Sequence, residues 1–408
     1  MHSKATLMLA FFGASLHANA ASVWEFPNFS DRVQISLANH HSVPFDGVVA
    51  LNLALLKRTA PGFPGTLLLA AEDAQPAQAL ETQLDHDEFL VAVHLNANET
   101  QPISLYYSNV QHDQLPIVPR VYASHAYGYN RATVAIESER MGYRTYGGFF
   151  FDVQAHSKDQ LGLINSLLGY SSISHPPREG EDIIHLGDTL GVGGIFLRTS
   201  SDVYRPTLST PDYTHRTPKS DEPSYKVIES GSLRAVVEES LSHWTIGPDT
   251  VAVRARYEMD ANQEIVHCHW WITPTLISRI YEIGAGILML SNENNTDADE
   301  IITTTGIQEK SVGRIAVGMS YAHTGAKHVV TLETPGGKNK VVIFPKKLTK
   351  GGEVSGEYNF AASWTGSGWP DPAAHVRDIL AQQSEPPTAT ILAHETNPNP
   401  KALEAEPK

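Results

Sequence analysis

The chain has 408 residues, with 30 Lys and Arg against 45 Asp and Glu, which gives a formal net charge of −15. A nucleic-acid partner needs a basic face that displaces counterions, so this acidic balance argues against one. Hydrophobic residues make up 41% and charged residues 18%, which excludes a wholly disordered chain, and the length is enough for two cores. The single cysteine, Cys268, excludes an internal disulfide.

The first twenty residues have the order of a secretory signal peptide. His2 and Lys4 precede the apolar run ATLMLAFFGASL, and the small residues of Ala18-Asn19-Ala20 follow it. The run is shorter than the roughly 20 apolar residues that a membrane-spanning helix needs, and no other segment approaches that length. We therefore expect residues 1–20 to be removed near Ala20, no membrane span, and a mature protein in a periplasm or outside the cell.

Short alternating apolar runs fill the chain from Trp24 to Tyr107. Bounded by Pro, Gly, Asn or Asp, they are typical of strands in a β-sandwich. They cover residues 33–37, 48–55, 65–70, 89–95 and 103–107. The pattern predicts an N-terminal β-sandwich domain over residues 21–111, followed by a linker at His112–Pro119, where prolines interrupt the chain.

Strand-like runs continue over residues 120–383, with almost no helical period between them. They cover residues 133–137, 147–153, 194–197, 225–228, 233–239, 250–257, 264–272, 287–290, 315–319, 328–332, 340–344 and 357–364. We predict an all-β protein whose second domain is large and antiparallel. Two exceptions are a helix or loop at Ser157–Leu168 and an amphipathic helix at Pro372–Gln382. The polar, Pro-rich tail over residues 384–408 is expected to be disordered.

Residues 120–146 concentrate tyrosines and arginines around one histidine. Aromatic faces and guanidinium groups are suited to stacking on sugar rings and to binding carboxylates. A solvated strand face is the alternative for any one of these residues. The candidate catalytic residues of this segment are His125, Tyr129, Arg140, Tyr143 and Arg144, and the candidate substrate-binding residues are Tyr127, Asn130 and Tyr146.

A second cluster lies in the predicted strand over residues 264–272. Period-two geometry puts His267, His269 and Trp271 on one face and Cys268 on the other, with the two histidines about 6–7 Å apart along the strand. We take both histidines as catalytic candidates, Trp271 as a substrate-binding candidate, and Cys268 as a buried apolar residue. Hydrogen-bonded structural histidines are the alternative. A metal would need a third ligand that no spacing supplies, so no metal site is predicted.

The glycine-rich segment HLGDTLGVGG adds His185 as a catalytic candidate. The loop over residues 207–223 could act as a lid, and its His215 is a substrate-binding candidate. The glycines do not match a nucleotide-binding fingerprint, and neither a Gly-x-Ser-x-Gly nor a His-Glu-x-x-His motif occurs. The oxygen-rich residues 292–297 could hold calcium weakly, although a polar turn is the simpler interpretation. Otherwise the sequence indicates no cofactor.

Four segments together resemble one family: ESERMGYRTYGG, HLGDTLGVGGIFL, YKVIESGSLRAVVE and YNFAASWTGSGW. They are similar to the secreted bacterial family known as domain of unknown function 4861, and the likeness extends over most of the mature chain, including RVQISLANHHSVP. The resemblance implies a two-part all-β protein whose larger part is a β-supersandwich of the galactose-mutarotase-like type, a group that includes domains of polysaccharide lyases. It also implies work on carbohydrates in the cell envelope, with pectin and other uronate glycans as the context, and supplies no catalytic residues.

The function predicted from these features is a lyase that cleaves uronate-containing, pectin-like oligosaccharides by β-elimination. This chemistry needs a cation opposite the carboxylate, a base and an acid. Arg140 or Arg144 suits the first role, a histidine from the candidates above the second, and Tyr127, Tyr129 or Tyr143 the third. The alternatives are a glycoside hydrolase using Glu137 and Glu139, and a non-catalytic glycan-binding envelope protein.

Overall fold

The fold is that of a computed structural model of the chain. The predicted signal peptide, the helix or loop at Ser157–Leu168 and nearly all of the predicted linker lie outside the described residues. The structure describes residues 24–73, 77–109, 119–128, 131–145, 147–155, 181–206, 223–290, 296–308, 313–322, 324–326 and 328–398.

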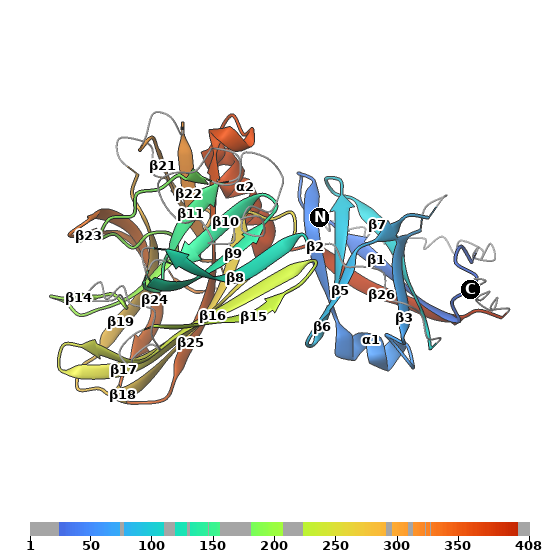
Figure 1. The fold of residues 1–408 in the computed structure, drawn as a ribbon, viewed down its shortest axis with the longest axis horizontal. Helices are drawn as coiled ribbons and strands as arrows, with labels where there is room; N and C mark the ends of the chain where they lie inside the picture. The colour runs from blue at the N-terminus through green and yellow to red at the C-terminus, as the bar shows by residue number, and fades with distance from the viewer. Residues whose placement is uncertain are drawn as a thin grey trace, which may run out of the picture.

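The described part of the chain forms two lobes, and strands are its main secondary structure (Figure 1). The smaller lobe is a sandwich of two antiparallel sheets around one apolar core. Its first sheet has the order β26 (Thr388–Thr396), β1 (Asp31–Ala38), β7 (Thr100–Ser108), β3 (Leu67–Glu72) and β4 (Ala79–Leu80). Its second sheet has the order β2 (Phe45–Asn52), β6 (Glu88–Leu95) and β5 (Thr82–Asp85).

One predicted strand of the smaller lobe ends earlier than expected. We expected a strand through Leu55, but β2 ends at Asn52 and helix α1 (Leu53–Thr59) begins there. The Asn52 side chain accepts a hydrogen bond from the backbone N–H of Leu55, which caps the first turn of the helix. Leu53 and Leu56 are buried on the helix face toward the core.

The C-terminal tail is not disordered over Thr388–Thr396, so our expectation for residues 384–408 was wrong there. These residues form β26, which pairs antiparallel with β1. Arg32 of β1 is buried and forms an ion pair with Glu395 at 2.6 Å. The tail has little apolar surface, but a neighbouring strand satisfies its backbone and its charges, which composition alone does not reveal.

The larger lobe contains three antiparallel sheets, which confirms the predicted all-β fold. The first has the order β12 (Glu181–Asp182), β11 (Phe151–Ala155), β10 (Met141–Thr145), β9 (Arg131–Ser138) and β8 (Val121–Gly128). The second has the order β14 (Val203–Tyr204), β13 (Gly194–Arg198), β19 (Tyr281–Leu288), β24 (Gly337–Leu348) and β23 (His328–Thr334). The third has the order β15 (Ser224–Ser230), β16 (Arg234–Ile246), β17 (Asp249–Asp260), β18 (Ile265–Leu276), β25 (Val354–Trp364), β22 (Ile315–Ser320), β21 (Ile301–Gly306) and β20 (Thr296–Ala298).

The eight-stranded sheet packs one face into the main core, where residues from all three sheets of this lobe meet. On β18, Cys268 and Trp270 point into that core and are 0% and 1% exposed, which confirms the parity predicted for this strand. Helix α2 (Pro372–Ser384) contacts β21, β22 and β25 of the same sheet and is capped by Asp371. The predicted helix at Pro372–Gln382 is therefore correct, and a 3₁₀ turn, η2 (Thr365–Ser367), precedes it.

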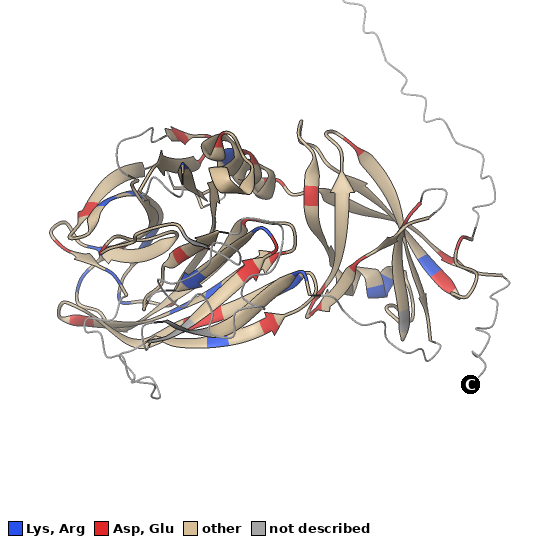
Figure 2. Ribbon diagram, turned by 45° about the horizontal axis from the view of Figure 1, so that its top comes forward, with Lys and Arg blue, Asp and Glu red and all other residues tan. Residues whose placement is uncertain are grey.

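Charged residues join the two lobes. Arg234 of β16 reaches Asp85 at 3.5 Å and Glu88 at 2.5 Å in the smaller lobe. A second contact centres on Asp46 of β2, which accepts a hydrogen bond from Arg140 at 3.0 Å and one from Asn262 at 2.9 Å. Basic and acidic positions are interleaved on the strands of the larger lobe, as Figure 2 shows. Specific ion pairs therefore connect the lobes.

Candidate functional site

Three neighbouring strands place polar and aromatic side chains on the face of the eight-stranded sheet that points away from the core. The β17–β18–β25 register aligns Arg256 with His269 and Glu357, and Arg254 with Trp271 and Ser355. The next row aligns Glu258 with His267 and Asn359. The structure thus brings together the three residues that strand parity predicted on one face, His267, His269 and Trp271, with partners from two other strands.

His267, His269 and Glu357 form a compact cluster. The Nδ1 atom of His269 lies 3.4 Å from Glu357 Oε2, and the Nε2 atom of His267 lies 4.0 Å from the same oxygen. One ligand-type atom from each of the three residues lies within 4.8 Å of the other two. The side chains are 31%, 34% and 51% exposed, so the cluster is open to solvent.

The surroundings of the cluster lower the pKa of His269 and orient the ring of His267. Burial lowers the pKa of His269, and His267 lowers it further, while Glu258 and Glu357 act in the opposite direction. The Nδ1 atom of His267 forms a hydrogen bond with the side-chain oxygen of Asn359. That oxygen only accepts, so it holds the N–H of Nδ1 and leaves Nε2 as the ring nitrogen that faces Glu357.

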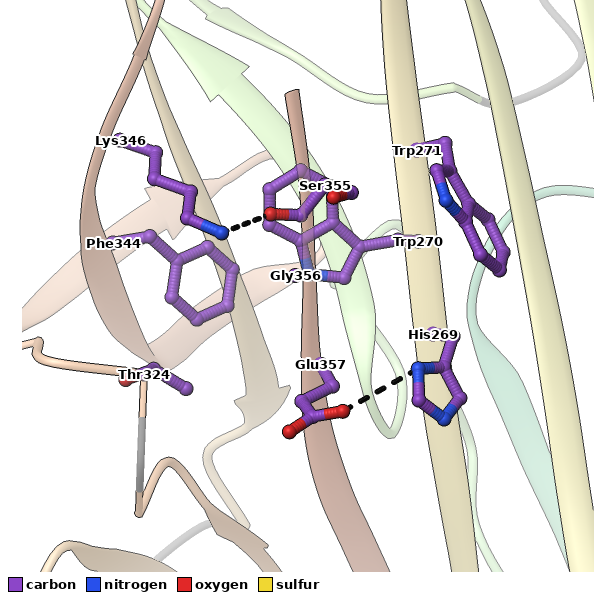
Figure 3. A pocket seen from close by; sticks show the side chains of 9 residues that line it. All are labelled: His269, Trp270, Trp271, Thr324, Phe344, Lys346, Ser355, Gly356 and Glu357. Atoms are coloured by element: carbon purple, nitrogen blue, oxygen red, sulfur yellow. Dashed lines mark hydrogen bonds and ion pairs between the residues drawn. The ribbon is translucent and has the colours of Figure 1, made fainter. Parts of the chain in front are cut away.

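A cavity of about 340 Å³ opens beside this cluster (Figure 3). It is lined by His269, Trp270, Trp271, Thr324, Phe344, Lys346, Ser355, Gly356 and Glu357. Strand β25 pairs with β22 only from Asn359 onward, so its first residues have β18 on one side and no described strand on the other. The cavity therefore lies beside an edge of this sheet.

Aromatic residues and Lys346 line this cavity, and Arg254 lies outside its lining, against Trp271. The guanidinium carbon of Arg254 lies 4.2 Å from the ring centroid of Trp271, which stacks on His269. On the other wall, Trp270 stacks on Phe344 with centroids 5.4 Å apart. Lys346 lies beside Phe344 on this second wall, and its Nζ donates a hydrogen bond to the carbonyl oxygen of Ser355 (Figure 3).

Gly356 keeps the middle of the cavity open. A Cβ at this position would come within 2.6 Å of the indole of Trp270, closer than any ordinary contact. The backbone of β25 therefore lies directly against Trp270, with no side chain between them.

A second cavity, of about 230 Å³, lies between the two lobes and shares His269 with the first. Phe45, Val48 and Glu88 contribute from the smaller lobe, and Arg234, Glu258 and His267 are among the residues from the larger one. The histidine cluster is therefore the place where an aromatic cavity and an interdomain cavity meet.

Most of the Tyr/Arg segment does not reach this site. Tyr143 is fully buried and donates a hydrogen bond to the carbonyl oxygen of Glu264, and burial raises its pKa well above the ordinary value. Arg144 is 2% exposed and forms an ion pair with Asp152 at 3.5 Å. Arg140 joins the lobes through Asp46. Tyr143 and Arg144 therefore have contacts inside the larger lobe, and Arg140 connects the two lobes. None of the three lies beside His267 and His269.

The remaining candidates are separate from the cluster or lie outside the described residues. His125 of β8 and His185 are exposed and line neither cavity. Glu137 is buried, and Glu139 forms an ion pair with Arg120 at 2.7 Å, so this carboxylate pair does not flank a cleft. Tyr129, Asn130, Tyr146, His215 and residues 292–295 of the oxygen-rich segment lie outside the described residues, as does the side chain of Tyr127.

Sequence reasoning missed Glu357, Asn359, Arg254 and Lys346. Glu357 and Asn359 lie in a predicted strand, but only the pairing of β25 with β18 puts them beside the histidines. A sequence pattern gives the face of each residue on its own strand and not the neighbour across the sheet. The third ligand-type residue, which the spacing along β18 could not supply, comes from a strand about ninety residues further on.

A family model described as "Domain of unknown function (DUF4861)" matches residues 45–385. The chain belongs to this family. The match runs from the first residue of β2 to the residue after α2, so the DUF4861 region contains the cluster and both cavities. A search of curated proteins finds no match to this DUF4861 protein.

Solved structures with a similar fold include two proteins of Enterococcus faecalis. One, a protein in glycosyl hydrolase family 38, is 9% identical with a TM-score of 0.50, and the match covers 89% of this chain and 47% of that one. The other, an alpha-mannosidase, is 9% identical with a TM-score of 0.48, and the match covers 90% of this chain and 46% of that one. The DUF4861 protein thus spans about half the length of these structures, and at this identity the first likeness concerns the fold alone.

Among the described residues, no helix has the length and apolarity needed to cross a membrane.

Proposed function

We propose that this DUF4861 protein is a carbohydrate-active enzyme that binds uronate-containing oligosaccharides in the cavity beside His269 and Glu357 and cleaves them by β-elimination. The observation that carries the proposal is the composition of that cavity, which aromatic faces, Lys346, His269 and Glu357 line, with Arg254 stacked on Trp271 beside it. The similar structure from glycosyl hydrolase family 38 and the β-supersandwich resemblance support a carbohydrate substrate.

Recognition of the sugar would use both walls of the cavity. Trp271 offers a partly exposed aromatic face for a sugar ring, and Arg254 beside it offers a guanidinium for the uronate carboxylate. Lys346 offers a second cation from the opposite wall. The chain as a whole is acidic, so these local cations suit a short, weakly charged oligosaccharide better than a long polyanion.

The reaction itself breaks a C–O bond without water. A base removes the proton from the carbon next to the carboxylate, a C=C bond forms, and the C–O bond to the leaving sugar breaks. The leaving oxygen then takes a proton, so atoms and charge balance. Cations against the carboxylate stabilise the charge that develops as the proton leaves. We assign that electrostatic role to Arg254 and Lys346, and the proton-accepting side of the cavity to the histidine cluster.

The test is incubation of the purified protein with fragments of pectin, rhamnogalacturonan, alginate and ulvan while ultraviolet absorbance is followed. A lyase produces unsaturated sugars that absorb, and Trp271→Ala and Arg254→Met should lower the rate at least tenfold. His243→Ala, at an exposed histidine of β16 that lines neither cavity, should leave the rate unchanged.

Two other outcomes would overturn the lyase proposal. New reducing ends without absorbance would identify a hydrolase. Calorimetry that detects oligosaccharide binding without any product would identify a non-catalytic glycan-binding protein, the second alternative drawn from the sequence.

A further inference from the structure

We propose that His267, His269 and Glu357 bind a divalent transition-metal cation, of the Zn²⁺ or Mn²⁺ class. The site stands on ligand geometry alone and holds whether or not the protein cleaves a glycan.

The distances within the cluster suit a common cation. Two ligands that each lie about 2.1 Å from Zn²⁺ at a tetrahedral angle are about 3.4 Å apart. The Nδ1 atom of His269 and the Oε2 atom of Glu357 are 3.4 Å apart, and the Nε2 atom of His267 lies 4.0 Å from the same oxygen. Because all three side chains are only partly buried, the imidazole of His267 can move closer without disturbing the core.

Asn359 gives His267 the kind of hydrogen-bond partner that a metal-bound histidine usually has. A metal-bound histidine usually donates its second ring N–H to a nearby oxygen, which fixes the tautomer and the ring orientation. Asn359 provides that oxygen to Nδ1, so Nε2 of His267, which faces Glu357, is the ring nitrogen left for a metal. This contact is independent of the three ligands, and Asn359 lies two residues beyond Glu357 on the same face of β25.

The charges near the cluster leave Glu357 available. Arg256, the cross-strand neighbour of His269, forms its ion pair with Glu258 at 2.7 Å. No ion pair between Glu357 and a lysine or arginine is present among the described residues. Two imidazoles and one carboxylate favour a transition metal over Ca²⁺, which prefers an all-oxygen shell. Three protein ligands also leave a coordination position open, as in catalytic zinc sites.

The position of the cation would bear on the proposed reaction. His269 and Glu357 line the aromatic cavity, so an open coordination position would be accessible to a carboxylate or a water in that cavity. This consequence rests on the proposed function. With the cation bound, His267 and His269 are ligands, so a hydroxide at the open position would take the base role assigned above to the histidine cluster, and the cation would stabilise the charge formed on proton removal. Metal binding itself does not depend on it.

The experiment is calorimetric titration of tag-free, chelator-treated full chain with Zn²⁺ and, separately, with Mn²⁺ and Ca²⁺, in the absence of any glycan. We expect saturable binding of one Zn²⁺ or Mn²⁺ per chain and no saturable binding of Ca²⁺. Glu357→Gln and His269→Ala should each weaken binding at least tenfold, and Asn359→Ala should weaken it about 10–100-fold, as loss of an outer-shell partner does.

His243→Ala is the matched control and should bind like the wild type, because its histidine is exposed and lies outside the cluster. Circular dichroism of each variant confirms that the fold is kept. A second readout is the visible absorption of bound Co²⁺, which should disappear in Glu357→Gln and His269→Ala. The proposal fails if the wild type shows no saturable binding, or if these variants bind as well as His243→Ala does. Because no glycan is present, either failure leaves the lyase proposal untouched.

Discussion

Replacing Arg234 by methionine should destabilise the protein by about 3 kcal/mol, the lower end of the range for breaking a buried ion pair from one side. Arg234 is 11% exposed and holds Asp260 with two hydrogen bonds, Nε to Oδ1 at 2.7 Å and Nη2 to Oδ2 at 3.0 Å. It also reaches Asp85, which is 4% exposed, at 3.5 Å. Methionine keeps the apolar stem but leaves these two carboxylates without their cation.

The contacts of Arg234 do not contribute equally. Glu88 is 43% exposed, so solvent screens its pair with Arg234 and that contact adds only about 0–1 kcal/mol. Asp85 is buried and Asp260 is 17% exposed, so their desolvated carboxylates account for most of the loss. The estimate is placed at the low end because Asp260 keeps part of its contact with water.

The assay is urea denaturation followed by circular dichroism, with Arg198→Met as the control. Arg198 is 27% exposed and pairs with Glu282, which is 37% exposed, so its loss should change stability by less than about 1 kcal/mol. Adding Asp85→Asn to Arg234→Met should restore part of the lost stability, because the unpaired buried charge is removed. If Arg234→Met costs no more than Arg198→Met, or Asp85→Asn restores nothing, the buried-charge explanation is refuted.

Three further predictions concern the buried carboxyl, the tail and the cavity. Burial raises the pKa of Glu239, so this carboxyl ionises at a lower pH in the unfolded chain than in the folded protein. The free energy of unfolding should therefore fall as pH rises above about 4.3, and the urea midpoints of Glu239→Gln should not show that fall. Removing residues 388–408 should make the smaller lobe more sensitive to limited proteolysis, whereas loss of a disordered tail would not. Gly356→Val should abolish glycan binding in calorimetry and lower the urea midpoint below that of His243→Ala, because its side chain would collide with the buried Trp270 and narrow the cavity.

The parity of β18 was predictable because a strand has only two faces. An apolar Cys268 between polar residues identifies the buried side, and His267, His269 and Trp271 then share the other. Tyr143 and Arg144 were chosen on residue type alone, and parity could not have corrected that choice, because both faces of β10 are buried and alternation no longer separates inside from outside. Tyrosine and arginine can form hydrogen bonds and ion pairs in a buried interior as well as in a ligand-binding cleft, so residue type alone does not distinguish the two.

The residue patterns along the chain did not indicate which strands pair with one another across a sheet. Nothing in the tail resembles a core strand, yet β26 binds the edge of β1 through backbone hydrogen bonds and the Arg32–Glu395 ion pair. The partnership of Glu357 with His269 has the same origin, since it depends on which strand lies next to β18. Both cases turn on a sheet order that local sequence leaves undetermined.

The smaller lobe contributes residues to the proposed site. The interdomain cavity takes Phe45 and Val48 from β2 and Glu88 from β6, and it shares His269 with the aromatic cavity. The family match begins at residue 45 and ends at 385, so it includes these strands but leaves out β1 and β26, the pair that closes the far sheet of the same lobe. The strands of the smaller lobe nearest the histidine cluster are therefore inside the family region, and a ligand that extends past His269 would contact both lobes.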